Sequence, residues 1–285
     1  MKTVQLGTIS VIHETWLPYA AACLISYCNK IPQIKENYTF NEPLYKFKPV
    51  EEYTEQFKNI DIFGLTCYVW NQAYNDQLMS HYKDVNPNGI AMYGGPNIPE
   101  DPELAEQFAK EHPYIDIFWV GPGEKLVSNF LKNIDAPMQT HDGGFGIGWN
   151  NVEVGRKLYQ IETYEMPTPY LDGTFDSILA KEKRVKASFE TNRGCPFKCA
   201  FCDWGVNEYR KVGKRNPKLS KRELTFLALN KVKGIVLEDA NWGMFKSDID
   251  ITKHWAALYT RYKMLYRENL SHSKNQKDNV IKIIL

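Results

Sequence analysis

Three cysteines, Cys195, Cys199 and Cys202, lie within one short stretch of the chain. A loop with these spacings can direct three sulfurs toward one side of a cubane iron–sulfur cluster. A four-iron cluster usually takes four cysteines, so a set of three leaves one iron open to a small chelating cofactor. Structural zinc is the alternative, but it needs four nitrogen or sulfur ligands, and the candidates for the fourth are the adjacent Asp203 and the distant His254. The spacing alone leaves an iron–sulfur site, a zinc site and a fortuitous cluster open.

The elements that must position this loop are strands and helices in alternation. A strand from Lys186 to Thr191 is expected directly before the loop. Further strands are expected at 234–238 and 280–285, and helices at 221–230 and 249–265. Strands separated by helices indicate a parallel sheet.

The first 135 residues show the same alternation and predict a flavodoxin-like (Rossmann-type) α/β fold with a parallel sheet. The expected strands are 4–12, 61–68, 89–93 and 115–120, and the expected helices are 19–29, 75–82, 102–111 and 124–131. Asp101 is a plausible cap for the third of these helices. Parallel sheets bind ligands at the carboxyl ends of their strands. Glycines follow the third and fourth strands there, at Gly94, Gly95, Gly121 and Gly123.

Residues 136–180 break the alternation. Glycines between Gly143 and Gly148, followed by Pro167 and Pro169, indicate an irregular connector. These glycines miss the dinucleotide-binding spacing and are interpreted as loop. We therefore predict an α/β domain at 1–135, which the resemblance described below makes cobalamin-binding-like, a Gly/Pro-rich linker at 136–180 and a second domain at 181–285.

Charge is distributed unevenly between the two halves. Residues 1–180 hold 12 Lys and Arg against 23 Asp and Glu, whereas residues 181–285 hold 23 against 11. The densest basic stretch comprises Arg210, Lys211, Lys214, Arg215, Lys218, Lys221 and Arg222. It could neutralise an anionic substrate or a nucleic-acid backbone, but we interpret it as a solvated loop that leads into a helix. Nucleic acid is not expected as a partner.

Composition is that of an ordinary globular protein, with 43% hydrophobic and 24% charged residues in 285 positions. That length is sufficient for two domains with their own cores. The apolar runs are too short to cross a bilayer, so a cytoplasmic location without membrane partners is expected. Six cysteines are too few for a disulfide scaffold.

An ordered set of motifs extends through much of the chain. Its members are Leu17-Pro18-Tyr19-Ala20-Ala21, Gly94-Gly95-Pro96, Gly121-Pro122-Gly123-Glu124, Pro167-Thr168-Pro169-Tyr170, Arg193-Gly194-Cys195-Pro196, Cys202-Asp203-Trp204-Gly205 and Glu238-Asp239-Ala240-Asn241-Trp242-Gly243. Together with the Cys-x3-Cys-x2-Cys run, this set resembles the radical SAM superfamily. The resemblance is closest to the branch in which a cobalamin-binding-type domain precedes the radical SAM barrel.

This resemblance implies roles for particular residues. The three cysteines would ligate a [4Fe-4S] cluster whose fourth iron chelates S-adenosylmethionine, and an electron donor would drive its cleavage to a 5′-deoxyadenosyl radical. Phe201 would contact the adenine of that cofactor. Asp239 and Asn241, after a parallel strand, would accept hydrogen bonds from the methionyl ammonium or the ribose, although turn and capping chemistry explains them equally well.

Cobalamin is implied as a possible second cofactor, near the four glycines named above. The Asp-x-His-x-x-Gly run of domains with a lower-axial histidine is absent around His13. Three alternatives are open for the domain: it holds cobalamin by shape, binds another molecule or acts as a scaffold.

The resemblance also implies a barrel of about six β/α units, more than residues 186–285 supply. We expect the chain to be truncated within that barrel, and a separate polypeptide is one way to complete it. The leading hypothesis is a radical SAM enzyme, or its N-terminal portion, that acts on an unknown small organic substrate, with methyl transfer if cobalamin is bound. A non-catalytic zinc or iron–sulfur binding module and an inactive remnant are the alternatives.

Overall fold

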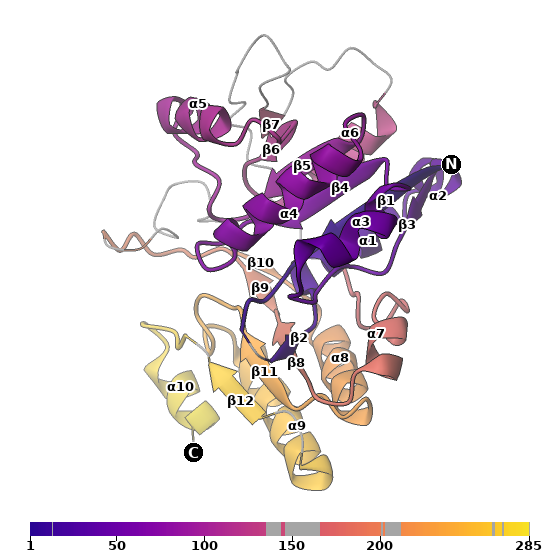
Figure 1. Cartoon of the computed structure of the whole chain (residues 1–285). Helices are drawn as coiled ribbons and strands as arrows, with labels where there is room; N and C mark the ends of the chain where they lie inside the picture. The colour runs from indigo at the N-terminus through magenta and orange to yellow at the C-terminus, as the bar shows by residue number, and fades with distance from the viewer. Residues whose placement is uncertain are drawn as a thin grey trace. The chain divides into compact units, whose positions relative to one another are not determined.

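Parallel β-sheets organise both units of the chain in a computed structural model (Figure 1). The structure describes residues 1–12, 14–134, 144–145, 166–200, 202, 212–263, 266–269 and 271–284. Unit 1 comprises Met1–His13 and Pro18–Tyr159, and unit 2 comprises Glu14–Leu17 and Gln160–Leu285. Each unit is considered by itself.

The sheet of unit 1 has the strand order β3-β1-β4-β5-β6-β7. These strands are β3 (Tyr38–Phe40), β1 (Lys2–Gly7), β4 (Ile62–Thr66), β5 (Ile90–Gly94), β6 (Ile117–Trp119) and β7 (Gly144–Phe145). The first five strands in this order run parallel, and β7 is antiparallel to β6. Because parallel strands require crossover connections, helices cover both faces of the sheet.

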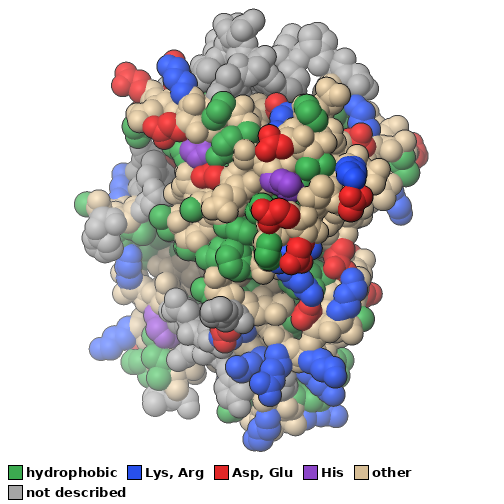
Figure 2. All heavy atoms as spheres, in the orientation of Figure 1, with side chains coloured by type: hydrophobic (Ala, Val, Ile, Leu, Met, Phe, Trp, Pro, Cys, Tyr) green, Lys and Arg blue, Asp and Glu red, His purple; other side chains and the backbone are tan. Residues whose placement is uncertain are grey.

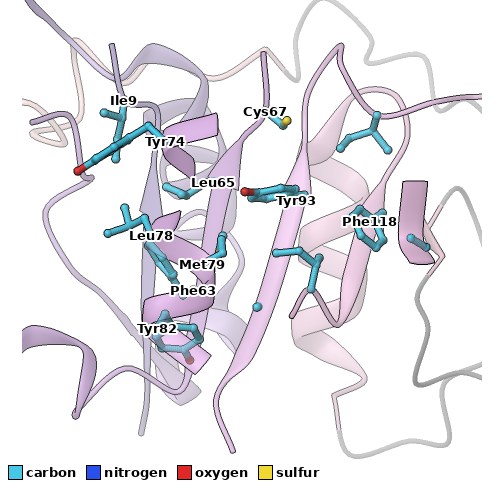
Figure 3. Close-up of a cluster of buried hydrophobic side chains, with 14 of the residues drawn as sticks. Ile9, Phe63, Leu65, Cys67, Tyr74, Leu78, Met79, Tyr82, Tyr93 and Phe118 are labelled. Atoms are coloured by element: carbon cyan, nitrogen blue, oxygen red, sulfur yellow. The ribbon is translucent and has the colours of Figure 1, made fainter. Parts of the chain in front are cut away.

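Those helices divide between two buried clusters of side chains. The helical elements of unit 1 are α1 (Tyr19–Cys28), α2 (Pro32–Asn37), η1 (Val50–Tyr53), α3 (Thr54–Phe57), α4 (Gln72–Val85), α5 (Pro102–Glu111) and α6 (Gly123–Lys132). One cluster joins α3, α4 and α5 to the face that carries Phe63 and Tyr93 (Figure 3). The other joins α1, α2 and α6 to the opposite face, which carries Ile62 and Met92. Successive strand residues therefore point into different cores, as the pleat requires.

The expected α/β class with a parallel sheet is confirmed for unit 1. Asp101 caps α5, because its Oδ1 accepts from the backbone nitrogens of Glu103 and Leu104 at 3.0 and 3.2 Å. Two details of the prediction were wrong. The first strand ends at Gly7 rather than Ile12, and the glycine-rich run expected as loop includes the short strand β7.

The sheet of unit 2 has the strand order β12-β11-β8-β2, with every pair parallel. Its strands are β12 (Tyr266–Asn269), β11 (Gly234–Leu237), β8 (Val185–Phe189) and β2 (Thr15–Trp16). The edge strand β2 comes from far earlier in the chain, and Leu17 continues it by donating to the Lys186 carbonyl oxygen at 2.9 Å. Sequence periodicity gives no signal for a strand this short.

The helices of unit 2 are α7 (Asp176–Lys181), α8 (Pro217–Leu229), α9 (Lys246–Tyr262) and α10 (Lys277–Ile284). The strand expected at 280–285 was wrong, since residues 277–284 form α10. In a helix, Val280 and Ile283 share one face, and both lie against the position that a Cβ on Gly243 would take. A short apolar run does not by itself distinguish strand from helix, and here helical packing decides.

Among the described residues, no helix combines the length and apolar character that a bilayer crossing would need.

Candidate functional site

The cysteine loop begins where β8 ends. After Phe189 the chain enters a two-residue strand, β9 (Asn192–Arg193), which pairs antiparallel with β10 (Gly213–Lys214). Arg215 adds a backbone hydrogen bond to the Thr191 carbonyl oxygen at 2.8 Å. The two ends of the segment that holds all three cysteines are thereby tied together at the carboxyl end of a parallel strand. Binding sites of parallel sheets are found at such ends.

Asp239 anchors the start of this loop. Its Oδ1 accepts from the backbone nitrogens of Thr191 and Asn192 at 2.7 and 3.1 Å. Its Oδ2 accepts from the Thr191 hydroxyl and from Asn192 Nδ2. Burial raises the pKa of Asp239 to about 7, against the lowering effect of these hydrogen bonds. A carboxylate has about four acceptor positions, so Asp239 already uses its capacity within the protein, and the expected contact with S-adenosylmethionine stays a prediction.

Asn241 lies beside the first cysteine. Its Nδ2 donates to Cys195 Sγ at 3.0 Å, and both side chains are buried. Within the described part of the chain, Asn241 Oδ1 has no hydrogen-bond partner although it is buried. Such an atom costs free energy until a donor reaches it. The predicted acceptor is therefore present next to a cysteine sulfur.

Lys274 lies beside the second cysteine, and its Nζ donates to Cys199 Sγ at 2.9 Å. The pKa of Lys274 is raised, first by this hydrogen bond and then, against a lowering by burial, by its electrostatic interactions with the three cysteines. The backbone nitrogen of Cys202 donates to the Cys199 carbonyl oxygen at 3.0 Å, which makes a turn between the second and third cysteines. Sequence reasoning missed Lys274, because it lies far along the chain and in no recognisable motif.

Two further acceptors were also missed. Glu190 Oε2 and Asn192 Oδ1 are buried, and neither has a hydrogen-bond partner in the described part of the chain. The other oxygen of Glu190, Oε1, accepts from Arg193 Nε at 2.7 Å. Glu190 lies at the end of the predicted strand and Asn192 directly follows it, and that position was the available signal.

The described residues contain no group of three or more His, Cys, Asp or Glu side chains gathered as a metal site. His254, considered as a fourth zinc ligand, instead hydrogen-bonds α8, through the Thr225 hydroxyl at 2.9 Å and the Lys221 carbonyl oxygen at 3.1 Å. Asp203, Phe201 and His13 lie outside the described residues. The observed cysteine environment is therefore one of thiols with hydrogen-bond donors.

The glycines proposed for cobalamin lie in unit 1, and backbone geometry accounts for two of them. Gly95 and Gly121 have φ values of +109° and +87°, which side chains rarely adopt. A Cβ on Gly95 would also come within 2.7 Å of the Cys67 carbonyl oxygen. On Gly123 it would come within 3.0 Å of the Leu24 side chain, and on Gly94 no closer than 3.6 Å to Trp119. Of these four glycines, Gly94 alone has neither a backbone conformation nor a close contact that requires glycine.

The basic stretch differs in part from its interpretation as a solvated loop. Arg215 is buried, pairs with the buried Glu223 and donates to the Pro167 carbonyl oxygen at 2.7 Å. Arg210 and Lys211 lie outside the described residues. The exposed basic residues of unit 2 include Lys218 and Arg222, and basic side chains gather on the face shown over α8 and α9 (Figure 2). Part of the stretch is thus an internal anchor.

A parallel α/β unit and a second β/α unit that carries a three-cysteine loop are the two parts expected from the resemblance to radical SAM enzymes with an N-terminal cobalamin-binding-type domain. No family model matches the chain. It is 31% identical over 278 residues to a 2-(S-pantetheinyl)-carbapenam-3-carboxylate methyltransferase of Streptantibioticus cattleyicolor. It is 30% identical over 276 residues to the cobalamin-dependent radical SAM methyltransferase TokK of Streptomyces tokunonensis. The chain is a relative of these two methyltransferases, one of which, TokK, is cobalamin-dependent and of the radical SAM type by name.

Each of these two alignments covers 94% of this chain and 40% of the relative, so the chain spans about two fifths of the length of the curated relatives it matches. Solved structures agree on the fold. OxsB, a cobalamin-dependent S-adenosylmethionine radical enzyme solved with aqua-cobalamin, matches with a TM-score of 0.71 at 16% identity, over 100% of this chain and 41% of that one. The radical S-adenosylmethionine methyltransferase TsrM of Kitasatospora setae matches with a TM-score of 0.63 at 16% identity, over 92% and 52%.

Proposed function

We propose that unit 2 binds a [4Fe-4S] cluster through Cys195, Cys199 and Cys202 and binds S-adenosylmethionine beside it. The observation that carries this proposal is the pair of hydrogen bonds to cysteine sulfur, from Asn241 to Cys195 and from Lys274 to Cys199. Thiolate ligands of a cluster are stabilised by such donors. A structural zinc site would need a fourth ligand, and His254, one of the two candidates, is instead hydrogen-bonded to α8.

The residues around the loop fit the two groups. Three thiolates leave one iron of the cluster for the cofactor, and the bound pair would supply a carbon-centred radical. Asn241 Oδ1, a buried acceptor with no hydrogen-bond partner in the described chain, would accept from an N–H of the methionyl amine. Glu190 and Asn192 offer two more such acceptors after β8. Asp239 holds the start of the loop in place, and Phe201 remains the predicted contact of the adenine.

We propose methyl transfer to a small organic substrate as the reaction of the enzyme to which these units contribute. The support is the relatives, which are methyltransferases by name. Because the chain spans about 40% of their length, the complete reaction is proposed for this chain together with the remainder of such an enzyme, on the same or a separate polypeptide. An external one-electron donor and a cytoplasmic location belong to the same proposal.

We propose cobalamin as a ligand of unit 1, near the carboxyl ends of β5 and β6. Trp119 Nε1 is a buried donor without an acceptor in the described part of the chain, and Gly94 lies beside Trp119. The amide side chains of a corrinoid offer carbonyl oxygens to such a donor. Gly95, Gly121 and Gly123 also border this edge, with the packing and backbone roles given above.

Anaerobic reconstitution of the whole chain with iron and sulfide tests the cluster. We expect about four irons and four sulfides per chain, and release of 5′-deoxyadenosine when S-adenosylmethionine and a reductant are added. Absence of any cluster, with all three loop thiols still open to alkylation, would overturn the proposal. So would stoichiometric zinc that is retained through aerobic purification and blocks reconstitution.

A further inference from the structure

The segment that follows β12, residues 271–276 and here named the strap, lies against the residues after β11. Trp242 donates its backbone N–H to the Ser271 carbonyl oxygen at 2.7 Å. Ser273 donates its backbone N–H back to the Trp242 carbonyl oxygen at 2.8 Å. Trp242 is 1% exposed, so this short ladder is held by a fully buried side chain. The strap therefore has a fixed position relative to Asn241, the residue just before the ladder.

Each of the two segments joined by the ladder carries a side chain that donates a hydrogen bond to a cysteine sulfur. Asn241 reaches Cys195 Sγ at 3.0 Å, and Lys274, one residue beyond Ser273, reaches Cys199 Sγ at 2.9 Å. The first donor is a neutral amide, and the second is an ammonium with a full positive charge. A charged donor at this distance forms a shorter and stronger hydrogen bond than a neutral one.

We propose that Lys274 is a positioning residue that raises the reduction potential of the cluster through its hydrogen bond to Cys199. This inference rests on the proposed function, because it requires the cluster on the three cysteines. In the reduction the cluster gains one electron from an external one-electron donor, no bond breaks, and the ammonium keeps its proton. The added negative charge is spread over iron and sulfur, so a positive donor on a ligand sulfur favours the reduced state.

A purely structural role for Lys274 is the competing explanation. Its Nζ also lies 5.8 Å from the centre of the Phe197 ring, so the side chain could simply pack the loop. A packing role predicts a change in cluster content or stability when Lys274 is replaced, without a change in potential. A tuning role predicts a change in potential at equal cluster content.

The test is an anaerobic potentiometric titration of the reconstituted full chain, followed by absorbance and by the electron paramagnetic resonance (EPR) signal of the reduced cluster. The variants are Lys274→Met, Lys274→Arg and, as a matched control, Lys277→Met. Lys277 is an exposed lysine three residues further on. We expect Lys274→Met to lower the equilibrium constant for reduction of the cluster about tenfold. For a one-electron couple this lowers the reduction potential by about 59 mV. Lys274→Arg should restore most of the difference, and Lys277→Met should match the wild type.

Equal potentials for wild type and Lys274→Met, at equal iron content, would overturn the inference and leave the proposed function intact. A fall in iron content with no shift in potential would overturn it in favour of packing. A shift of the same size in Lys277→Met would also overturn it, since general surface charge would then explain the result. A wild-type chain that assembles no cluster would instead overturn the proposed function, and the inference with it.

Discussion

The carboxyl ends of the parallel strands carry different kinds of residue in the two units. In unit 1, Gly95 fits a backbone turn that closes against the Cys67 carbonyl oxygen, and Asn71 uses its amide to hold neighbouring backbone, with Nδ2 donating to the Ile9 carbonyl oxygen at 3.0 Å. In unit 2, two cysteine sulfurs accept hydrogen bonds and Asn241 keeps an unused buried acceptor. Glycines at a sheet edge can thus serve the fold alone, so a ligand is better indicated by buried polar atoms without partners in the described chain, such as Asn241 Oδ1 in unit 2 and Trp119 Nε1 in unit 1.

The largest effect that separates the two units should come from their cysteines. Cys195→Ala should abolish iron binding, because a cluster with two remaining protein ligands is not retained. Cys28→Ala in unit 1 is the control, since burial raises the pKa of that thiol and keeps it protonated. We expect it to keep about four irons per chain. Iron analysis after anaerobic reconstitution measures both, and equal iron in the two variants would contradict the assignment.

Asp239→Ala should have the next largest effect, on folding rather than on ligands. It removes the acceptor of four hydrogen bonds from Thr191 and Asn192. Since each intramolecular hydrogen bond contributes about 0.5–1.5 kcal/mol net, the loss of four should destabilise the chain by about 2–6 kcal/mol. Denaturant unfolding of the apo chain measures it, with the exposed Asp250→Ala as the control. A loss below about 1 kcal/mol would mean that the anchor is not needed.

A pair of neighbouring glycines tests whether unit 1 has a ligand role beyond its turns. Gly95→Ala should destabilise by about 2 kcal/mol, because a side chain there is strained and meets backbone. Gly94→Ala meets only an ordinary contact and should change stability by less than about 0.5 kcal/mol. If Gly94 contacts cobalamin, its variant should still weaken cobalamin binding about tenfold. Unchanged binding, measured by absorbance titration with hydroxocobalamin, would remove Gly94 from the proposed site.

The smallest effect should be a pH dependence of unit 1 that arises from His112. Burial lowers the pKa of His112, but hydrogen bonds to Asp76 and to the Phe108 carbonyl oxygen outweigh it and raise the pKa above its usual value. The folded state therefore binds this proton more tightly than the unfolded state. The resulting stability is fully present below the unfolded pKa of about 6.5 and is lost as the pH rises through the folded pKa. Unfolding midpoints of wild type and His112→Gln across this range should differ in slope, and parallel curves would exclude His112.

Strong periodicity explains what could be predicted from sequence. Helices α4 and α5 and strands β4 and β5 have amphipathic or fully apolar patterns, and Asp101 is a local capping signal. Strand β2 has two residues and depends on pairing with β8. The short apolar run in α10 fits a strand as well as a helix. The secondary structure of such elements depends on tertiary contacts, so no local sequence pattern predicts it.

The residues of the site fall into the same two groups, those that a local motif predicts and those that depend on tertiary contacts. The three cysteines and Asn241 were predicted because each lies in a short motif after a strand. Lys274 was not, since its relation to Cys199 depends on the ladder between Trp242 and the strap. Arg215 was interpreted as solvated because its buried partner Glu223 lies eight positions further on and gives no signal of burial. Charge alone does not tell an internal anchor from a surface residue.

The central claim is that three cysteines of unit 2 hold a cluster with one iron open to S-adenosylmethionine. The most direct test is the EPR spectrum of the reduced, reconstituted chain with and without S-adenosylmethionine. Binding of the amine and carboxylate to the open iron should change the g-values of the reduced cluster, and the change should be absent in Asn241→Ala at the same cofactor concentration. Identical wild-type spectra with and without saturating S-adenosylmethionine would contradict the claim.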